Sequence, residues 1–293
     1  MASNHINSIL SSILQELLTQ TEWMWLEEKG GAEPLQLMTA FVATPRFVGR
    51  RSVTISQENT IALNDEVPGF TVTDWSTVRL SRVWLLTCLD SSDQETYVRH
   101  IETLFDTAEM NELVALYSAL PLLDYPQKWL FRATEAVRSN VGDVFDALVM
   151  HNPYPAHYFT EAAWNQLVLK TIFNDKPIHK IVGLEERANP TLAHMLSDFA
   201  HERWAAGRSV APEVWRLSSG FMDNALLEDM KHLLASEDPN DHKAAALACF
   251  HATSSAAHTL LAQHPVLEKA VQHRTISWAD LEFNDLNTYA TKP

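Results

Sequence analysis

The sequence predicts an all-α protein. Apolar residues recur at helical spacing along most of the 293 residues, and glycine occurs only 8 times. So few glycines argue against nucleotide-binding loops and against an architecture of many strands. Short helices joined by polar turns, without a strict repeat length, favour an irregular α-solenoid of HEAT-like pairs. A compact helical bundle is the alternative.

Residues 1–73 begin with a helix and then become irregular. Apolar residues from Ile6 to Leu18 share one face and predict an amphipathic helix over residues 1–29, which Gly30 and Gly31 end. The segment around residues 50–65 is rich in Ser, Thr, Val and Ile with partial alternation. This segment predicts a short β-hairpin or a long loop.

The helical pattern resumes at Asp74, a predicted N-cap, and continues to residue 273. Thr160 is a predicted N-cap for a helix ending near Phe173, and Asn189 with Pro190 begins a helix that ends at Gly207. Other helices are predicted at 94–105, 110–120, 126–138, 140–150, 212–217, 224–235, 242–251, 254–263 and 266–273. No linker-like change in composition appears, so we expect a single helical domain over 1–293, divided into 1–73 and a helical-pair region, 74–293.

The net charge and the cysteine content narrow the expected partners and the expected cellular location. The chain has 22 Lys and Arg against 37 Asp and Glu, a net charge of −15, which repels nucleic acids and anionic membranes. No apolar run reaches the length of about 18 residues that a membrane span needs, so we expect no direct membrane insertion. Cys88 and Cys249 lie far apart in apolar surroundings, which favours reduced thiols and a cytoplasmic location.

The motifs of common enzyme classes are missing. The sequence contains no phosphate-binding Gly-rich loop, no Gly-x-Ser-x-Gly elbow and no His-Glu-x-x-His pair. We therefore predict no catalytic residues and no cofactor, and an enzyme is the less favoured of the readings left open.

The predicted helix 189–206 carries two polar features. Leu192, Met195, Leu196 and Phe199 define its buried face, and Arg203 falls within that face. A buried guanidinium needs an acidic or carbonyl partner, so Arg203 forms either a buried ion pair or an anion-binding group.

The opposite face of that helix carries His194, Asp198 and His201 at helical spacing. These are residue types that bind metals, but a face opposite the buried one is expected to be solvated. We therefore predict no metal site.

Two further polar residues lie in unusual places. Asn165 projects into the apolar face of the helix that follows Thr160, where a buried amide needs several hydrogen-bond partners. These partners are either the neighbouring Asn152–Pro155 turn or a ligand. Arg187 precedes Asn189 and either clamps a carboxylate or phosphate, or forms part of a charged approach to the helix.

The central segment contains several distinctive runs: His151–Pro155, Tyr158–Phe159, Ala163–Lys170, Leu184–Pro190, His201–Arg208 and Pro212–Arg216, with Pro45–Gly49 earlier in the chain. Together these runs resemble the EboA family. The resemblance implies a protein of a gene cluster that makes or transports a secondary metabolite, and it supplies no catalytic residues.

The resemblance and the residues together lead to two hypotheses. The first is a non-catalytic helical protein that binds a pathway metabolite or scaffolds the pathway enzymes, with other Ebo-pathway proteins or a small molecule as partners. The alternative is an enzyme acting on a small cyclic or isoprenoid-like intermediate. A purely structural subunit is a third reading. The predicted ligand-binding residues are Asn152, Tyr154, Asn165, Arg187 and Arg203.

Overall fold

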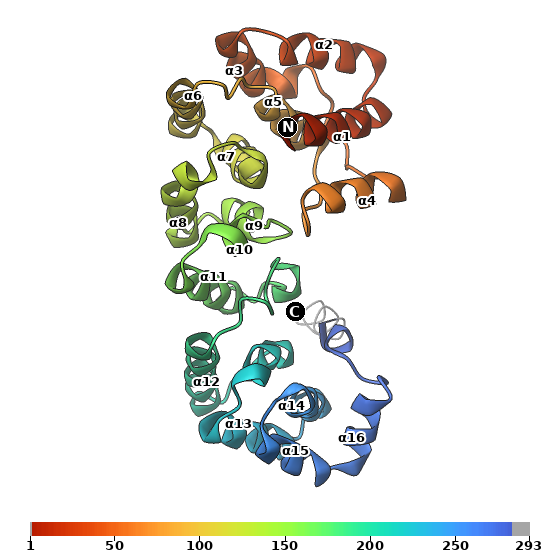
Figure 1. Ribbon diagram of the computed structural model, residues 1–293, viewed down its shortest axis with the longest axis vertical. Coiled ribbons are helices and arrows are strands. Elements are labelled where there is room, and N and C mark those ends of the chain that lie inside the picture. The colour runs from red at the N-terminus through yellow and green to blue at the C-terminus, as the bar shows by residue number, and fades with distance from the viewer. Residues whose placement is uncertain (1, 283–293) are drawn as a thin grey trace. The chain divides into compact units, whose positions relative to one another are not determined.

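The computed structural model describes residues 2–282, and these residues form helices joined by turns (Figure 1). Within this range no strand is present, and the two isolated β-bridges join Ser52 to Ser76 and Met150 to Ile181. The predicted all-α class is confirmed.

The chain divides into two compact units. The N-terminal unit comprises Met1–Trp164 and Lys180–Val182, and the C-terminal unit comprises Asn165–His179 and Gly183–Pro293. The HEAT-like arrangement and the single domain over 1–293 stay predictions. Among residues 2–282, no helix is both long and apolar enough to span a bilayer.

The N-terminal unit contains the first ten α-helices and the start of the eleventh. The helices are α1 (Ala2–Leu17), α2 (Gln20–Gly30), α3 (Pro34–Ala43), η1 (Thr44–Arg46), α4 (Gln57–Glu66), α5 (Thr77–Thr87), α6 (Gln94–Thr107), α7 (Met110–Ala119), η2 (Leu120–Leu122), η3 (Pro126–Trp129), α8 (Leu130–Arg138), α9 (Gly142–Val149), α10 (Tyr154–Tyr158) and α11 (Glu161–Phe173).

Helix α5 forms the centre of the N-terminal unit because nine of its eleven residues are buried, six of them apolar. It packs against α1, α3 and α7, and α7 packs in turn against α9. Ser76 caps α5 by accepting a hydrogen bond from the backbone N–H of Arg79 at 3.1 Å. The predicted cap, Asp74, is instead a turn residue with a φ of 65°.

Two predictions for residues 1–66 are wrong. The expected single helix over 1–29 is two helices, because Thr19 and Glu22 form a capping box that begins α2. The expected hairpin or long loop around 50–65 contains α4, which Ser56 caps through the backbone N–H of Asn59. In this segment, strand-like pairing is limited to the bridge between Ser52 and Ser76 and the adjacent backbone hydrogen bonds of Arg51 and Val53.

Glu22 also connects α2 to the chain around residue 50. Its carboxylate accepts hydrogen bonds from the Arg51 guanidinium at 2.7 and 3.0 Å and from the backbone N–H groups of Gly49 and Thr19 at 2.7 Å. The Arg51 hydrogen bonds are the largest cause that lowers the pKa of Glu22 from 4.5 to about 2.

The lowered pKa predicts a pH dependence of stability. Glu22 contributes fully above its unfolded pKa of 4.5, and this contribution is lost as the pH falls from 4.5 towards 2. Glu22→Gln is expected to lower the free energy of unfolding by about 1 to 2 kcal/mol at pH 7, since Arg51 is partly exposed. Urea unfolding at pH 7 and pH 3 measures this. The difference from wild type should shrink at pH 3, and the exposed Glu28→Gln should behave like wild type at both values.

The C-terminal unit continues from α11. Its helices are η4 (Ile178–Lys180, whose last residue belongs to the N-terminal unit), α12 (Pro190–Ala205), η5 (Pro212–Phe221), α13 (Asn224–Leu234), α14 (Pro239–His251), α15 (Ser255–Ala262) and α16 (Pro265–Gln272).

Helix α14 occupies the middle of this unit, surrounded by α13, α15 and α16 (Figure 1). Its buried residues are mainly alanines, from Ala244 to Ala248, which allow close approach of the surrounding helices and of η5. Two predicted N-caps are confirmed: Thr160 accepts from the backbone N–H of Ala163, and Asn189 from that of Leu192.

Candidate functional site

The predicted residues Asn152 and Tyr154 bond to the backbone of the N-terminal unit. Asn152 is buried, its Nδ2 donates to the carbonyls of Tyr117 and Ala147 at 3.0 Å, and its Oδ1 accepts from the backbone N–H of Tyr154 at 3.0 Å. The Tyr154 hydroxyl donates to the carbonyl of Pro126 at 2.6 Å. Burial raises the pKa of this phenol above its usual range, which fits a donor role.

Asn165 and Asn189 form a reciprocal amide pair in the C-terminal unit. Asn165 Nδ2 donates to Asn189 Oδ1 at 3.2 Å, and Asn189 Nδ2 donates back to Asn165 Oδ1 at 2.8 Å. Asn189 Nδ2 also donates to the carbonyl of the half-buried Arg187 at 3.2 Å. The buried amide of Asn165 therefore orients the N-cap of α12.

The predicted burial of Arg203 is wrong. Arg203 is half-exposed, its Nε donates to the carbonyl of Ser209 at 2.6 Å, and its guanidinium lies 5.6 Å from the Phe199 ring. Met195, expected on the same buried face, is 39% exposed. The predicted carbonyl partner is present, but Arg203 lies in the last turn of α12, at the opposite end from the Asn165–Asn189 pair.

The polar face of α12 contacts α13. The buried Asp229 of α13 accepts from Ser197 Oγ at 2.6 Å and lies 2.6 Å from His201 Nε2. The carboxylate lies between Ser197 and His201, whereas in a Ser–His–Asp triad the histidine lies between the other two. His194 Nε2 lies 3.1 Å from a different aspartate, Asp223. The two histidines of the predicted face therefore have separate partners.

A second group of polar residues, not predicted from the sequence, lies around η4 and η5, and we call it the η4–η5 cluster. It consists of His179, Glu185, Glu213, Arg216 and Glu282, all in the C-terminal unit. Arg216 donates through Nε to Glu185 Oε1 at 2.7 Å and through Nη1 to Glu282 Oε1. His179 Nδ1 lies 3.6 Å from Glu213 Oε2 and 4.0 Å from Glu282 Oε2.

Glu213 is the most buried of the three carboxylates in the η4–η5 cluster. It lies in the first turn of η5 and is only 6% exposed, whereas Glu185 is exposed. A sequence signal existed, because Glu213 is a carboxylate within the otherwise apolar run from Val210 to Trp215. Glu282, far along the chain, gave no such signal.

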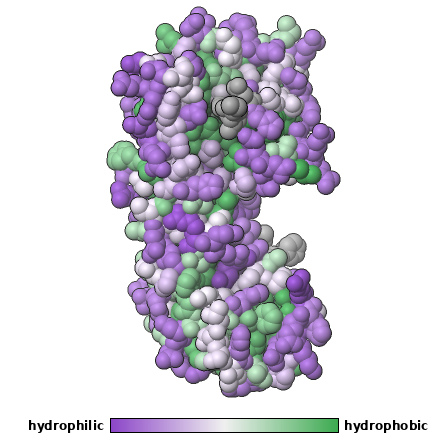
Figure 2. Space-filling view, in the orientation of Figure 1, coloured by the Kyte–Doolittle hydropathy of each residue, from purple (hydrophilic) through white to green (hydrophobic). Residues whose placement is uncertain are grey.

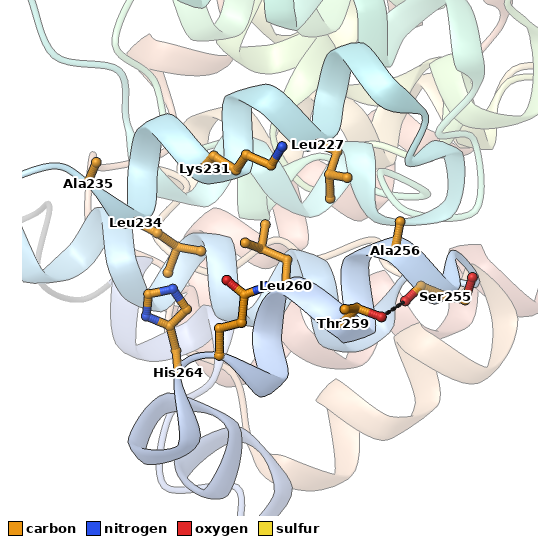
Figure 3. A pocket seen from close by; sticks show the side chains of 10 residues that line it. Leu227, Lys231, Leu234, Ala235, Ser255, Ala256, Thr259, Leu260 and His264 are labelled. Atoms are coloured by element: carbon orange, nitrogen blue, oxygen red, sulfur yellow. Dashed lines mark hydrogen bonds between the residues drawn. The ribbon is translucent and has the colours of Figure 1, made fainter.

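A groove lies between α13 and α15 (Figure 3). Its volume is about 580 Å³. Apolar residues line part of it: Leu227, Leu234, Ala235, Ala256 and Leu260. Polar residues complete the lining: Lys231, Ser255, Thr259, Gln263 and His264. Hydrophilic residues cover much of the surface seen in Figure 2, with smaller hydrophobic patches among them.

Fold and site together define an all-α protein in which most predicted polar residues bond to backbone and hold helices in place. The sequence model of the family described as metabolite traffic protein EboA matches residues 6–219, and the chain belongs to this family. No match to the chain is found among curated proteins or among solved structures. His179, Glu185, Glu213 and Arg216 lie within the matched range, and the groove lies beyond it.

Proposed function

We propose that the protein binds a small metabolite of its pathway without transforming it, in the groove between α13 and α15. The observation that carries this proposal is the groove itself, which combines an apolar lining with polar groups and lies within one compact unit. Its volume of about 580 Å³ falls in the range of about 300 to 1,000 Å³ that is usual for small-molecule sites.

The lining indicates the chemistry of the ligand. Leu227, Leu234 and Leu260 suit an apolar ring or chain, while Lys231 and His264 suit a hydroxyl or acidic group. Lys231 pairs with the exposed Glu228 at 2.7 Å, a contact weak enough for a ligand to displace. A partly apolar metabolite with one polar end therefore fits best.

A non-catalytic role agrees with the family description, which concerns metabolite traffic. The two cysteines, Cys88 and Cys249, are free, and burial raises the pKa of each thiol, to about 11 and about 12. Unreactive thiols suit a reducing compartment, and we propose a cytoplasmic location.

The five ligand-binding residues predicted from the sequence stay a proposal. The hydrogen bonds of Asn152, Tyr154 and Asn165 support a role in positioning helices more than direct ligand contact. At opposite ends of α12, the backbone carbonyl of Arg187 accepts from Asn189, and the guanidinium of Arg203 donates to the carbonyl of Ser209.

Retention of a metabolite tests the proposal. The purified protein is incubated with a small-molecule extract of cells that express the pathway, and bound molecules are identified by native mass spectrometry. Ala256→Trp fills the groove from an exposed position on α15, and His258→Trp places the same side chain on α15 outside the groove lining.

We expect wild type and His258→Trp to retain the same molecule unchanged in mass, and Ala256→Trp to retain about tenfold less or none. Equal retention of the molecule by both variants would contradict binding in the groove. A bound molecule of altered mass would favour the enzyme hypothesis, and co-purification of pathway proteins without any small molecule would favour a scaffold.

A further inference from the structure

Three donor atoms converge in the η4–η5 cluster. His179 Nδ1, one oxygen of Glu213 and one of Glu282 all lie within 4.8 Å of one another. The separations of 3.6 and 4.0 Å from His179 Nδ1 exceed those of hydrogen bonds. The shorter separation is at the upper end of the spacing of about 3.3 to 3.6 Å that donors adopt around a tetrahedral ion with bonds of about 2.0 to 2.2 Å. The longer one exceeds that spacing, so the side chains would have to move closer together on binding an ion.

The charges within the cluster favour a cation. Glu185, Glu213 and Glu282 carry three negative charges, and Arg216 carries one positive charge. These four side chains together carry two excess negative charges, which favours the approach of a cation. Glu213 is 6% exposed, and buried carboxylates are stabilised either by ion pairs or by metal coordination.

Arg216 holds one of the three donors in position. It donates to Oε1 of Glu282, which leaves Oε2 as the oxygen nearest His179. Outer groups that orient metal-binding carboxylates in this way are a regular feature of metal sites. The Arg216 guanidinium also lies 5.7 Å from the Trp278 ring, on the segment that leads to Glu282.

We infer that His179, Glu213 and Glu282 bind a divalent transition-metal ion. One imidazole nitrogen and two carboxylate oxygens suit Zn²⁺, Mn²⁺ or Fe²⁺, and three protein ligands leave a position for water or a small ligand. This inference departs from the sequence-based expectation of no metal, which considered only the face of α12. It concerns a different site from the groove between α13 and α15 and does not depend on it.

Metal titration of the intact chain tests the site. The protein is purified, its affinity tag is removed, it is stripped with a chelator, and it is titrated with Zn²⁺ by calorimetry and with Co²⁺ by visible absorption. We expect one equivalent per chain, and Co²⁺ bands typical of nitrogen and oxygen donors without thiolate charge transfer. No saturable binding, or thiolate bands from Cys88 or Cys249, would overturn the inference.

Variants locate the ion. Glu213→Gln and His179→Ala are expected to weaken binding by about tenfold or more. Asp229→Asn removes the carboxylate partner of another histidine, His201, and should bind like wild type. Binding that is equal in wild type and Glu213→Gln would show that His179 and the two carboxylates form only an ion pair.

A measurement on the wild type keeps the test independent of variant folding. X-ray absorption of the zinc-loaded protein should show nitrogen and oxygen donors at about 2.0 to 2.2 Å with the scattering of a single imidazole. Two or more imidazoles would contradict the assigned ligands.

Discussion

Arg82→Ala is expected to lower the free energy of unfolding by about 3 to 5 kcal/mol. Arg82 lies on the central helix α5, is 2% exposed, and donates to the buried Glu112 carboxylate at 3.1 Å. Its Nε also donates to the carbonyl of Phe41 at 3.0 Å, so one side chain connects α5, α7 and α3. The substitution leaves the Glu112 carboxylate buried without its main counter-charge, which is the costly outcome.

Equilibrium unfolding in urea measures this loss. The double variant Arg82→Met/Glu112→Leu replaces both charges with apolar groups and should recover most of the stability. Arg138→Ala removes an exposed arginine that pairs with Glu135 three residues away, and should change stability by less than about 1 kcal/mol. A loss below about 1 kcal/mol for Arg82→Ala, or no recovery in the double variant, would contradict the role assigned to this ion pair.

Local signals predicted much of the fold. The helices that begin at Thr160 and at Asn189–Pro190 were correct because a capping side chain and a proline act within one turn of the residue that carries them. The capping box of Thr19 and Glu22 is equally local and was overlooked within a continuous apolar pattern. The helix α4 was missed because only Asn59 and Leu63 of its ten residues are buried, too few for a clear helical face.

The candidate sites were harder to predict, since they depend on packing between distant segments. A helical wheel treats every turn of α12 alike, but Arg203 lies in the last turn, beside the chain that turns at Gly207. Asn165 was correctly expected to need partners, but its partner is Asn189 and not the Asn152–Pro155 turn. The η4–η5 cluster joins His179, Glu213 and Glu282, which no periodicity connects.

The second large expected effect is the loss of stability on substitution of Asn152, a predicted site residue that is buried in the structure. Asn152→Ala is expected to lower the free energy of unfolding by about 2 to 4 kcal/mol, because the buried amide forms hydrogen bonds with three backbone groups. Those groups belong to Tyr117 at the end of α7, Ala147 in α9 and Tyr154 at the start of α10. Asn152→Asp keeps the acceptor for the Tyr154 N–H but places an anion against two carbonyls, so it should be no more stable than the alanine variant.

Urea unfolding of Asn152→Ala beside Asn140→Ala, an exposed asparagine in the same unit, separates this effect from a general loss of polarity. The asparagine at 140 should change stability by less than about 0.5 kcal/mol. The same variants also distinguish positioning from ligand contact. If Asn152 holds helices, metabolite retention per folded molecule stays at the wild-type level while stability falls. If the residue contacts the metabolite, retention falls even where unfolding is unchanged, and the positioning role assigned here would be wrong.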